Sequence, residues 1–225
     1  METNTQHREA NKLQGTGAWF NDRTGKLTAS RMAAAMSFLK AKKDELPKES
    51  SERRKLKIEI LAERLTGNIV PKYVTQEMQW GIDQEPMAKE AFTLATGMQV
   101  IDTGFVEHPS IDNCGASPDG IIESEVALLE IKCPSTSTML TWLIAARENP
   151  DWLPEDYLPQ MALQSACLGG CPVYFCAYDP RLPDKNKLLI RKYVPDSVYL
   201  ADVEAAAIGF LQEIDAMFEI LTTGE

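Results

Sequence analysis

Helical patterning is clearest at the end of the chain. Apolar side chains recur there every three or four residues, which is the spacing of one face of an α-helix. The stripe consists of Leu200, Val203, Ala207, Phe210, Leu211, Ile214, Met217, Phe218 and Leu221. We predict a closing helix over about 198–222 whose apolar face packs into the core.

The N-terminal part of the chain also predicts helices, joined by one long polar connection. Thr28 is a good N-cap for a first helix over 30–39. The charged stretch Lys40–Lys57, with Pro47 as a helix breaker, is interpreted as a mobile, basic-leaning loop. A second helix should follow it and end at Gly67, with one buried face made of Ile58, Leu61, Ala62 and Leu65.

A third helix is expected over 75–96, directly before the pattern changes to strands. We expect an interruption or a kink at Pro86, because proline lacks the backbone N–H that a helix interior requires. Gly97 should end this helix as its C-cap.

The middle of the chain predicts strands. Alternating or β-branched segments occur at 98–107, 120–122, 126–133, 173–178 and 187–194. Turns at 112–113 and 123–125 separate the first three, and a helix over 157–168 that ends at Gly169 and Gly170 precedes the last two. This order predicts an α/β (α+β) fold with a central mixed β-sheet flanked by helices. We expect one domain over 1–225, with a helical part at about 18–97, a sheet core at about 98–194 and the closing helix.

Length and composition restrict the class of protein. A chain of 225 residues with 44% hydrophobic residues buries a substantial core. No stretch has 18 uncharged apolar residues, and residues 1–17 lack the apolar centre of a signal peptide, so we expect a cytoplasmic protein without a membrane span. The net charge of −10 argues against a protein that coats nucleic acid over its whole surface, but it is compatible with a carboxylate-rich metal site.

The five cysteines do not follow a known ligand spacing. Cys167, Cys171 and Cys176 are separated by three and four residues, which fits neither a C-x2-C pair nor a four-ligand iron–sulfur or zinc site. An odd number of cysteines in an intracellular chain of this size favours reduced, structural thiols.

The strand expected at 126–133 carries the strongest chemical signal. Side chains alternate across a strand, so Glu130 and Lys132 share one face while their apolar neighbours point the other way. Two charged groups within an apolar strand are costly to bury unless they are paired or bind a metal. Asp119 lies eleven residues before Glu130, and a hairpin return of the chain would bring the two carboxylates together.

These groups suit the hydrolysis of a phosphodiester. Mg²⁺ held by Asp119 and Glu130 would offset the charge of the phosphate and acidify water, and the backbone carbonyl of Ile131 is a further ligand. Lys132 would orient that water, or accept its proton if the pKa of Lys132 is depressed. The alternative interpretations are a solvated ion pair between Glu130 and Lys132 and an ordinary turn around Asp119.

Six short motifs occur in one order along residues 19–181, and only their combination is specific. They are Trp19…Arg23…Thr28-Ala29-Ser30, Trp80-Gly81-x-x-x-Glu85, Ser117-Pro118-Asp119-Gly120, Leu129-Glu130-Ile131-Lys132-Cys133-Pro134, Tyr157-x-x-Gln160 and Tyr178-Asp179-Pro180-Arg181. With this set the chain resembles the phage λ exonuclease family, the YqaJ-type viral recombinases, which have a restriction-endonuclease-like core.

The resemblance implies a role for each matching residue of the site. Asp119, Glu130 and the Ile131 carbonyl would bind Mg²⁺, with Mn²⁺ as a substitute and two ions per site, and Lys132 would be the catalytic lysine. Glu85 would act as a second-metal ligand or a water-positioning group. Gln160 would complete the site, although alone it is typical of a solvated helix face, as Glu85 is.

The same resemblance assigns a terminal-phosphate pocket to Arg23, Ser30 and Ser117. A serine in the first turn of a helix and an arginine are suitable partners for an anion. Without the resemblance, Arg23 would be a surface ion-pairing residue and the two serines would be caps. Met78 matches an apolar residue that the family uses as a wedge between the separating strands, whereas most methionines at helical spacing belong to a core.

The activity implied by the resemblance is a 5′→3′ exonuclease on linear double-stranded DNA that leaves 3′ overhangs for annealing-type recombination. The implied assembly is a homotrimeric ring around DNA, with a single-strand-annealing recombinase as partner. The Lys40–Lys57 stretch is a candidate DNA-contacting loop, although its mixture of Lys, Glu and Ser also suits a solvated loop.

Three alternatives are set against this activity. An endonuclease or junction resolvase uses the same core. An iron–sulfur nuclease is disfavoured because no cysteine precedes Cys114. A non-catalytic DNA-binding module would lack a metal ligand or the lysine, and neither is missing.

Overall fold

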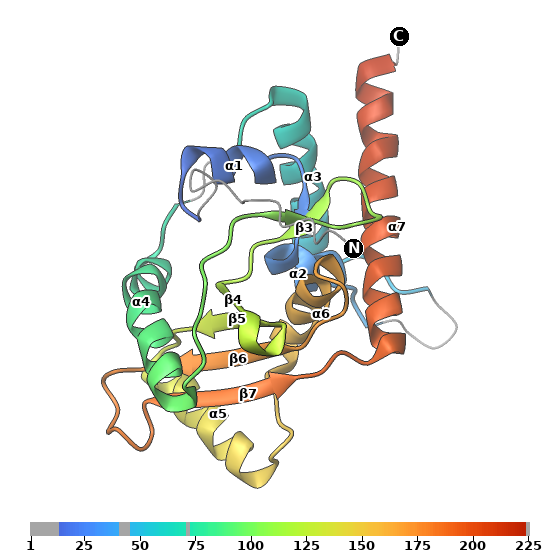
Figure 1. The fold of residues 1–225 in the computed structure, drawn as a ribbon. Helices are drawn as coiled ribbons and strands as arrows, with labels where there is room; N and C mark the ends of the chain where they lie inside the picture. The colour runs from blue at the N-terminus through green and yellow to red at the C-terminus, as the bar shows by residue number, and fades with distance from the viewer. Residues whose placement is uncertain (1–13, 41–45, 71–72, 224–225) are drawn as a thin grey trace, which may run out of the picture.

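A four-stranded mixed sheet forms the centre of the protein (Figure 1). The computed structural model describes residues 14–40, 46–70 and 73–223. The strands of this sheet, in spatial order, are β4 (Gly120–Ile122), β5 (Ala127–Lys132), β6 (Val173–Tyr178) and β7 (Leu188–Tyr193). β5 runs parallel to β6 and antiparallel to β4, and β7 is antiparallel to β6, so the predicted mixed sheet is confirmed.

Helices cover both faces of this sheet. Side chains of α4 (Gln76–Thr96), among them Phe92, pack with Leu129 and Ile131 on one face. Leu128 and Phe175 face the larger core, which is completed by α5 (Thr136–Glu148), α6 (Leu158–Cys167) and α7 (Ser197–Thr223). The segment from α5 through the 3-10 turn η4 (Glu155–Tyr157) to α6 connects β5 to β6. It is the crossover that two parallel neighbouring strands require.

A second, three-stranded sheet joins distant parts of the chain. Its spatial order is β1 (Leu27–Thr28), β3 (Cys114–Ala116) and β2 (Val106–Glu107), with β1 parallel and β2 antiparallel to β3. The sequence predicted one strand over 98–107, but within it only Val106 and Glu107 form a strand, and Ile101 and Gly104 are single bridge residues. Gly115 is required at the centre of this sheet, because a Cβ there would lie 2.5 Å from the Val106 carbonyl oxygen.

The N-terminal helices differ from the prediction. The helix expected over 30–39 is reduced to a 3-10 turn, η2 (Ala29–Arg31), followed by α2 (Met32–Ala35), and the Thr28 side chain makes no capping hydrogen bond. A short helix not expected from the sequence, α1 (Gly17–Arg23), precedes them and is capped by Thr16.

The predicted loop Lys40–Lys57 is wrong in its second half. Residues 41–45 lie outside the described residues, but α3 (Ser51–Thr66) begins inside the stretch, with the Ser50 side chain accepting from the Arg53 amide. The basic side chains of this turn are used within the protein, since Arg53 and Lys57 form ion pairs with Glu49 and Glu213.

The buried face of α3 also differs from the predicted one. Leu61 is buried as expected, but Ile58 and Leu65 are exposed, and Leu56 and Ile60 are buried instead. Ion pairs help to determine which face of α3 is buried. Arg53 and Glu63 lie on the buried face, where each binds a charged partner from another element. Gly67 ends α3 with a φ of +68°, as predicted.

The remaining helices follow the sequence pattern more closely. α4 is continuous through Pro86, so the expected interruption there is wrong, and the helix ends at Gly97 as predicted. In α7, the stripe residues from Val203 to Ile214 are buried, while Leu221 is exposed because the C-terminal end of the helix extends past the rest of the protein (Figure 1). α5 was not predicted.

The cysteines of the protein are free thiols. Cys114, Cys167 and Cys176 are buried, and Cys133 and Cys171 are half-buried. Burial raises the pKa of both Cys114 and Cys133 to about 12, so these thiols are protonated at neutral pH. Over the described ranges, we found no helix that combines the length and the hydropathy of a membrane span.

Candidate active site

The β4–β5 hairpin places Asp119 beside the acidic strand. Gly120 pairs with Leu129, and the Asp119 amide donates to the Leu129 carbonyl at 3.0 Å. The Asp119 side chain continues this pairing, because its Oδ2 accepts from the Ile131 amide at 2.6 Å. The expected hairpin therefore brings Asp119 next to the segment that carries Glu130 and Lys132.

Glu130 is buried in a shell of polar donors. Its side chain is among the least exposed of the protein, with the whole residue 1% exposed. Oε1 accepts from Gln160 Nε2 at 2.7 Å and forms an ion pair with Lys132, and Oε2 accepts from Gln164 Nε2 at 2.5 Å. These donors offset the cost of burying a carboxylate.

Lys132 lies between the acidic groups and an aromatic ring. Its Nζ is 4.8 Å from the centroid of the Tyr157 ring, close enough for a cation–π interaction. Burial alone would lower the pKa of Lys132, but the charges of Glu130 and Asp119 outweigh burial and raise that pKa above its ordinary value. Lys132 is therefore an ammonium ion, which favours its role as a donor that orients a substrate or water over the role of a base.

Burial raises the pKa of two carboxyl groups near this hairpin, Asp119 and Glu85. Burial raises the pKa of Asp119, and the negative charge of Glu130 raises it further. Burial also raises the pKa of Glu85 on α4, while Lys89, at 3.6 Å from its carboxylate, acts in the opposite direction. Because Glu130 affects both pKa values, the three acids share one electrostatic environment.

The residues at this point fit a divalent cation bound by oxygen. The negative charge of Glu130 raises the pKa of Asp119, and a bound cation would stabilise the two neighbouring carboxylates. The N–H and C=O of a strand residue point to the same strand edge, so the Ile131 carbonyl lies on the edge where its amide binds Asp119. Within the described residues, no three His, Cys, Asp or Glu side chains form a metal cluster on their own, so the ligand set would combine Asp119 and Glu130 with this carbonyl.

A second polar cluster surrounds Arg23 at the end of α1. Arg23 Nη1 donates to Ser117 Oγ at 2.9 Å, and Nη2 lies 3.4 Å from Thr28 Oγ1 and 3.5 Å from Ser30 Oγ. The guanidinium also stacks on the Trp19 ring at 4.2 Å, and the Trp19 indole donates to the same Ser117 hydroxyl. The structure thus brings together all three residues of the predicted phosphate pocket.

The electrostatics of this cluster suit an anion. Burial lowers the pKa of Arg23 to about 10, and the nearby charge of Arg31 lowers it too. The hydrogen bonds of Arg23 described above all go to neutral hydroxyls, whereas Arg31 binds both carboxylate oxygens of buried Glu63. A half-buried guanidinium among hydroxyl groups is stabilised by an anionic ligand.

Ser117 connects the two clusters, since it lies only two residues before Asp119. The Pro118 carbonyl between them accepts from Gln14 Nε2 at 2.8 Å. Any anion bound at Arg23 would therefore have a fixed relation to the acidic groups on the hairpin.

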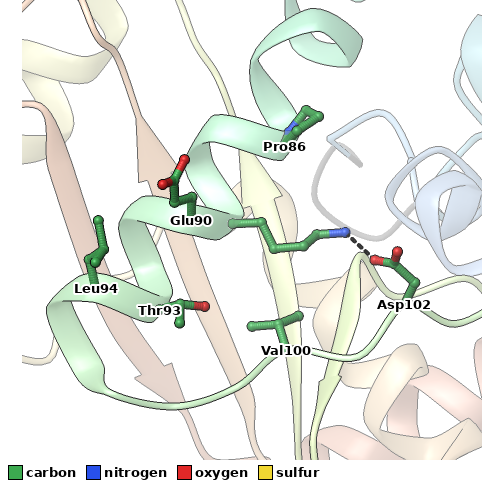
Figure 2. A pocket seen from close by; sticks show the side chains of 7 residues that line it. Pro86, Glu90, Thr93, Leu94, Val100 and Asp102 are labelled. Carbon is green, nitrogen blue, oxygen red and sulfur yellow. Dashed lines mark hydrogen bonds and ion pairs between the residues drawn. The ribbon is translucent and has the colours of Figure 1, made fainter.

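Met78 and Glu85 both belong to α4. Met78 is 49% exposed, so the interpretation of Met78 as a core residue is wrong, and its role as a wedge stays a prediction. Beside α4 lies a hollow of about 400 Å³ lined by Pro86, Lys89, Glu90, Thr93, Leu94, Val100 and Asp102 (Figure 2). Asp119, Glu130 and Lys132 do not line it, and Lys89 bridges it by donating to Asp102 at 2.7 Å.

Gln164 is the contact of the acidic cluster that sequence reasoning missed. It lies four residues after Gln160, so both amides project from one face of α6. That spacing was the available signal. Tyr157 was noticed as part of a motif, but its position beside Lys132 depends on packing against Trp142 and Phe175, which no local pattern indicates.

Comparison with known proteins gives one family. The profile of the YqaJ-like viral recombinase domain matches residues 18–170. The search of curated proteins found no match.

Solved structures agree with this family. Two structures of LHK-Exo, an alkaline exonuclease from Laribacter hongkongensis, one of them in complex with dAMP, are 33% identical to this chain, with a TM-score of 0.81. The similarity covers 92% of this chain and 97% of LHK-Exo. A phage-related exonuclease from Haemophilus somnus 129PT shares the fold, with a TM-score of 0.64 at 14% identity over 88% of this chain and 95% of that protein. The chain therefore belongs to the YqaJ-like viral recombinase family that its sequence motifs resemble.

Proposed function

We propose that this protein is a Mg²⁺-dependent 5′→3′ exonuclease that digests linear double-stranded DNA and leaves 3′ overhangs for annealing-type recombination. The observation that carries the proposal is the hairpin that places the Asp119 carboxylate beside the buried pair of Glu130 and Lys132. The similarity to LHK-Exo, an exonuclease whose structure is also known with the mononucleotide dAMP, supports a nuclease that releases nucleotides.

The side chains divide the reaction between them. Asp119, Glu130 and the Ile131 carbonyl would hold Mg²⁺, with Glu85 as the candidate for a second ion. When bound, Mg²⁺ supplies Lewis-acid chemistry, which offsets phosphodiester charge and makes water more acidic. The Lys132 ammonium donates hydrogen bonds that orient the attacking water and the scissile phosphate, and Gln160 holds Glu130 in place.

The Arg23 cluster explains a preference for one end of DNA. A terminal 5′-phosphate carries more negative charge than an internal phosphodiester, and Arg23 with the hydroxyls of Ser30 and Ser117 offers it a charged and two neutral partners. Since Ser117 and Asp119 are two residues apart, this pocket would place the bond after the terminal nucleotide at the acidic cluster. Hydrolysis then proceeds from the 5′ end.

A digestion experiment tests the proposal. Linear duplexes labelled at either end, with 5′-phosphoryl or 5′-hydroxyl termini, are incubated with the protein and Mg²⁺. We expect nucleotides to be lost first from 5′-phosphoryl ends and closed circular duplex to stay intact, with no digestion by Glu130→Gln or Lys132→Met. Digestion that begins at 3′ ends would contradict the polarity, and full activity of Glu130→Gln would contradict the site.

The endonuclease or junction-resolvase alternative gives the opposite result on the circular substrate. It predicts cleavage of closed circles and of four-way junctions without dependence on a terminal phosphate. The pocket around Arg23 favours end recognition, because an enzyme that cuts internally has no terminal phosphate to bind. The non-catalytic module predicts DNA binding with no digestion by the unsubstituted protein.

The proposed assembly is a homotrimeric ring in the cytoplasm of a bacterial host, acting with a single-strand-annealing recombinase. A ring would hold the DNA end near the sites while digestion proceeds. The Lys40–Lys57 stretch is not part of this proposal, because Arg53 and Lys57 are engaged with Glu49 and Glu213. Light scattering of the purified protein gives the number of subunits.

A further inference from the structure

Gln164 is a fully buried side chain that contacts the acidic cluster. It is 0% exposed, and its Nε2 donates to Glu130 Oε2 at 2.5 Å. Gln160, one helical turn earlier, donates to the other oxygen, Oε1, at 2.7 Å. The two amides therefore hold both oxygens of a single carboxylate.

The other end of the Gln164 amide finds no partner among the described residues. Its Oε1 is buried and accepts no hydrogen bond from the part of the chain that the structure describes. Buried carbonyl oxygens are normally paired, because an unmet acceptor destabilises the folded state. Turning the amide over would place its oxygen against Glu130 Oε2, which is repulsive. The interaction that fixes this side chain is thus its donation to Glu130.

We propose that Gln164 is a positioning residue that fixes the Glu130 carboxylate for binding a divalent cation. This inference rests on the proposed function, in which Glu130 is a metal ligand. A carboxylate has about four acceptor positions. Three of these positions are occupied by Gln160, Gln164 and Lys132. The carboxylate therefore cannot rotate about its terminal bond, and its fourth acceptor position points in a fixed direction.

One face of α6 and its preceding turn carries this arrangement. Tyr157, Gln160 and Gln164 follow one another at spacings of three and four residues, which places them along the same side. Tyr157 lies against the Lys132 ammonium, while the two glutamines bind Glu130. The helix thus holds the acid and the lysine at a fixed separation.

Calorimetric titration of the full-length, DNA-free protein with Mn²⁺ tests the inference. Gln164→Met keeps the length and volume of the side chain but removes the donor. We expect its affinity for Mn²⁺ to fall about 10- to 100-fold, as when the partners of metal ligands are removed elsewhere. The thermal unfolding temperature should fall only slightly, because removal of the unpaired Gln164 carbonyl partly offsets the loss of a donor to the buried Glu130 carboxylate.

Ser165→Ala is the matched control. Ser165 is the next residue of α6 and is equally buried, but its hydroxyl donates to the Cys171 carbonyl at 2.6 Å and not to Glu130. This substitution should lower stability while leaving the affinity for Mn²⁺ unchanged. A purely structural role of buried polar groups in α6 would instead give both variants the same behaviour.

The outcomes separate this inference from the proposed function. If the unsubstituted protein binds no Mn²⁺, the proposed metal site fails. If it binds Mn²⁺ and Gln164→Met binds equally well, only the positioning role fails.

Two further measurements keep the test decisive if Gln164→Met does not fold. Gln164→Asn retains an amide that is too short to reach Glu130, and the same loss of affinity is expected. In the unsubstituted protein with ¹⁵N-glutamine, the slowly exchanging side-chain amides should shift on addition of Mg²⁺, and unchanged signals would overturn the inference.

Discussion

Arg23 shows how one side chain joins stability and recognition. Its guanidinium is largely buried against Trp19 and hydroxyl groups, and burial lowers its pKa to about 10. It nevertheless remains charged at neutral pH. Among the described residues, the hydrogen bonds of Arg23 go to hydroxyl groups, so an anionic ligand would supply negative charge that this guanidinium lacks.

The Arg23→Ala variant tests whether Arg23 recognises the 5′-terminal phosphate of the DNA. Loss of a charge-assisted contact of about 1.5–3 kcal/mol should slow digestion of 5′-phosphoryl duplex about 10- to 150-fold, toward the rate on 5′-hydroxyl duplex. Initial rates on the two substrates give the ratio. Arg147→Ala, at an exposed arginine that binds Asn186, is the matched control and should keep the preference. An unchanged preference in Arg23→Ala would place the recognition of the end elsewhere.

Asp119 presents the opposite case, a residue that is unfavourable for stability. Its folded-state pKa is raised above the unfolded value, so the protein loses stability as pH rises from the unfolded pKa to the folded one. The loss is largest once the pH exceeds the folded-state pKa. Asn at position 119 still offers an oxygen to the Ile131 amide.

We therefore expect Asp119→Asn to abolish digestion and to stabilise the protein without metal by about 0.5–2 kcal/mol at pH 7. The difference should shrink as pH falls from the folded-state pKa toward about 4, the unfolded pKa of an aspartate. Urea unfolding at several pH values in EDTA measures it. Asp112→Asn, at an exposed aspartate, should change neither property. A destabilised Asp119→Asn protein would mean that the carboxylate is favourable where it lies.

At the scale of secondary-structure elements, the turn between β4 and β5 contains one strained backbone conformation, at Val126. Val126 has φ +49° and ψ +53°, the left-handed region that β-branched residues avoid, and its side chain is 74% exposed. The conformation costs about 1–2 kcal/mol in an ordinary L-residue. Exposure means that little packing is lost when the side chain changes.

Val126→Asn should stabilise the protein by about 1 kcal/mol, because asparagine tolerates left-handed backbone. For a protein of this size the unfolding temperature would rise by about 2–4 °C. Differential scanning calorimetry is the measurement. Val194→Asn, at another exposed valine that lacks a positive φ, should give no rise. Equal shifts in both variants would attribute the gain to surface polarity and not to the backbone.

The contact between α3 and α7 depends on a carboxylate. Glu213 accepts from both ends of the Arg53 guanidinium at 2.7 and 2.8 Å and from Lys57 at 2.9 Å. Hydrogen bonding by Arg53 lowers the pKa of Glu213 to about 2. The stabilisation is therefore complete above the unfolded pKa of about 4.3 and is lost as pH falls from there to about 2.

Glu213→Gln should destabilise the protein by about 1 kcal/mol at pH 7, a value that allows for solvent screening of the half-exposed pair. Chemical unfolding from pH 7 down to 3 should show the difference decreasing below about pH 5. Glu219→Gln, further along α7 and exposed, provides the comparison. A difference independent of pH would exclude the ion pair as its source.

Local patterning predicted those elements whose apolar residues follow a clear period. The β4–β5 hairpin, α6, β6, β7 and most of the α7 stripe agree with the sequence because apolar side chains make up most of their buried surface. In α3 the prediction failed, because Arg53 and Glu63 are buried through partners far away in sequence. The strands β1, β2 and β3 have two or three residues each, too few to show a period.

The part of the candidate site that could be predicted from the sequence is the part whose reactive side chains lie close together along the chain. Asp119, Glu130 and Lys132 fall on a hairpin, so their proximity follows from local register. The cluster of Arg23, Ser30 and Ser117 came only from the family resemblance, since the parallel pairing of β1 with β3 joins segments almost ninety residues apart. Gln164 was overlooked because a glutamine within a buried helix carries no chemical signal of its own.

At the scale of the whole molecule, charge and function oppose each other. The chain has a net charge of −10, which repels DNA over most of its surface. Arg53 and Lys57 do little to offset this, because Glu49 and Glu213 neutralise them. Binding should therefore be restricted to the end of the duplex, where Arg23 and a divalent cation supply positive charge together.

The same balance predicts that Mg²⁺ stabilises the protein before DNA is present. A ligand at about 100 times its dissociation constant stabilises the folded state by about 2.7 kcal/mol, which is about 5–11 °C in unfolding temperature for a chain of this length. Thermal unfolding in EDTA, Mg²⁺ and Ca²⁺ measures the shift, and Asp119→Asn should abolish it because one of two carboxylate ligands is gone. Since general screening of a −10 surface by cations would act equally on both proteins, an equal shift in the variant would show that Mg²⁺ stabilises through surface charge and not through the hairpin site.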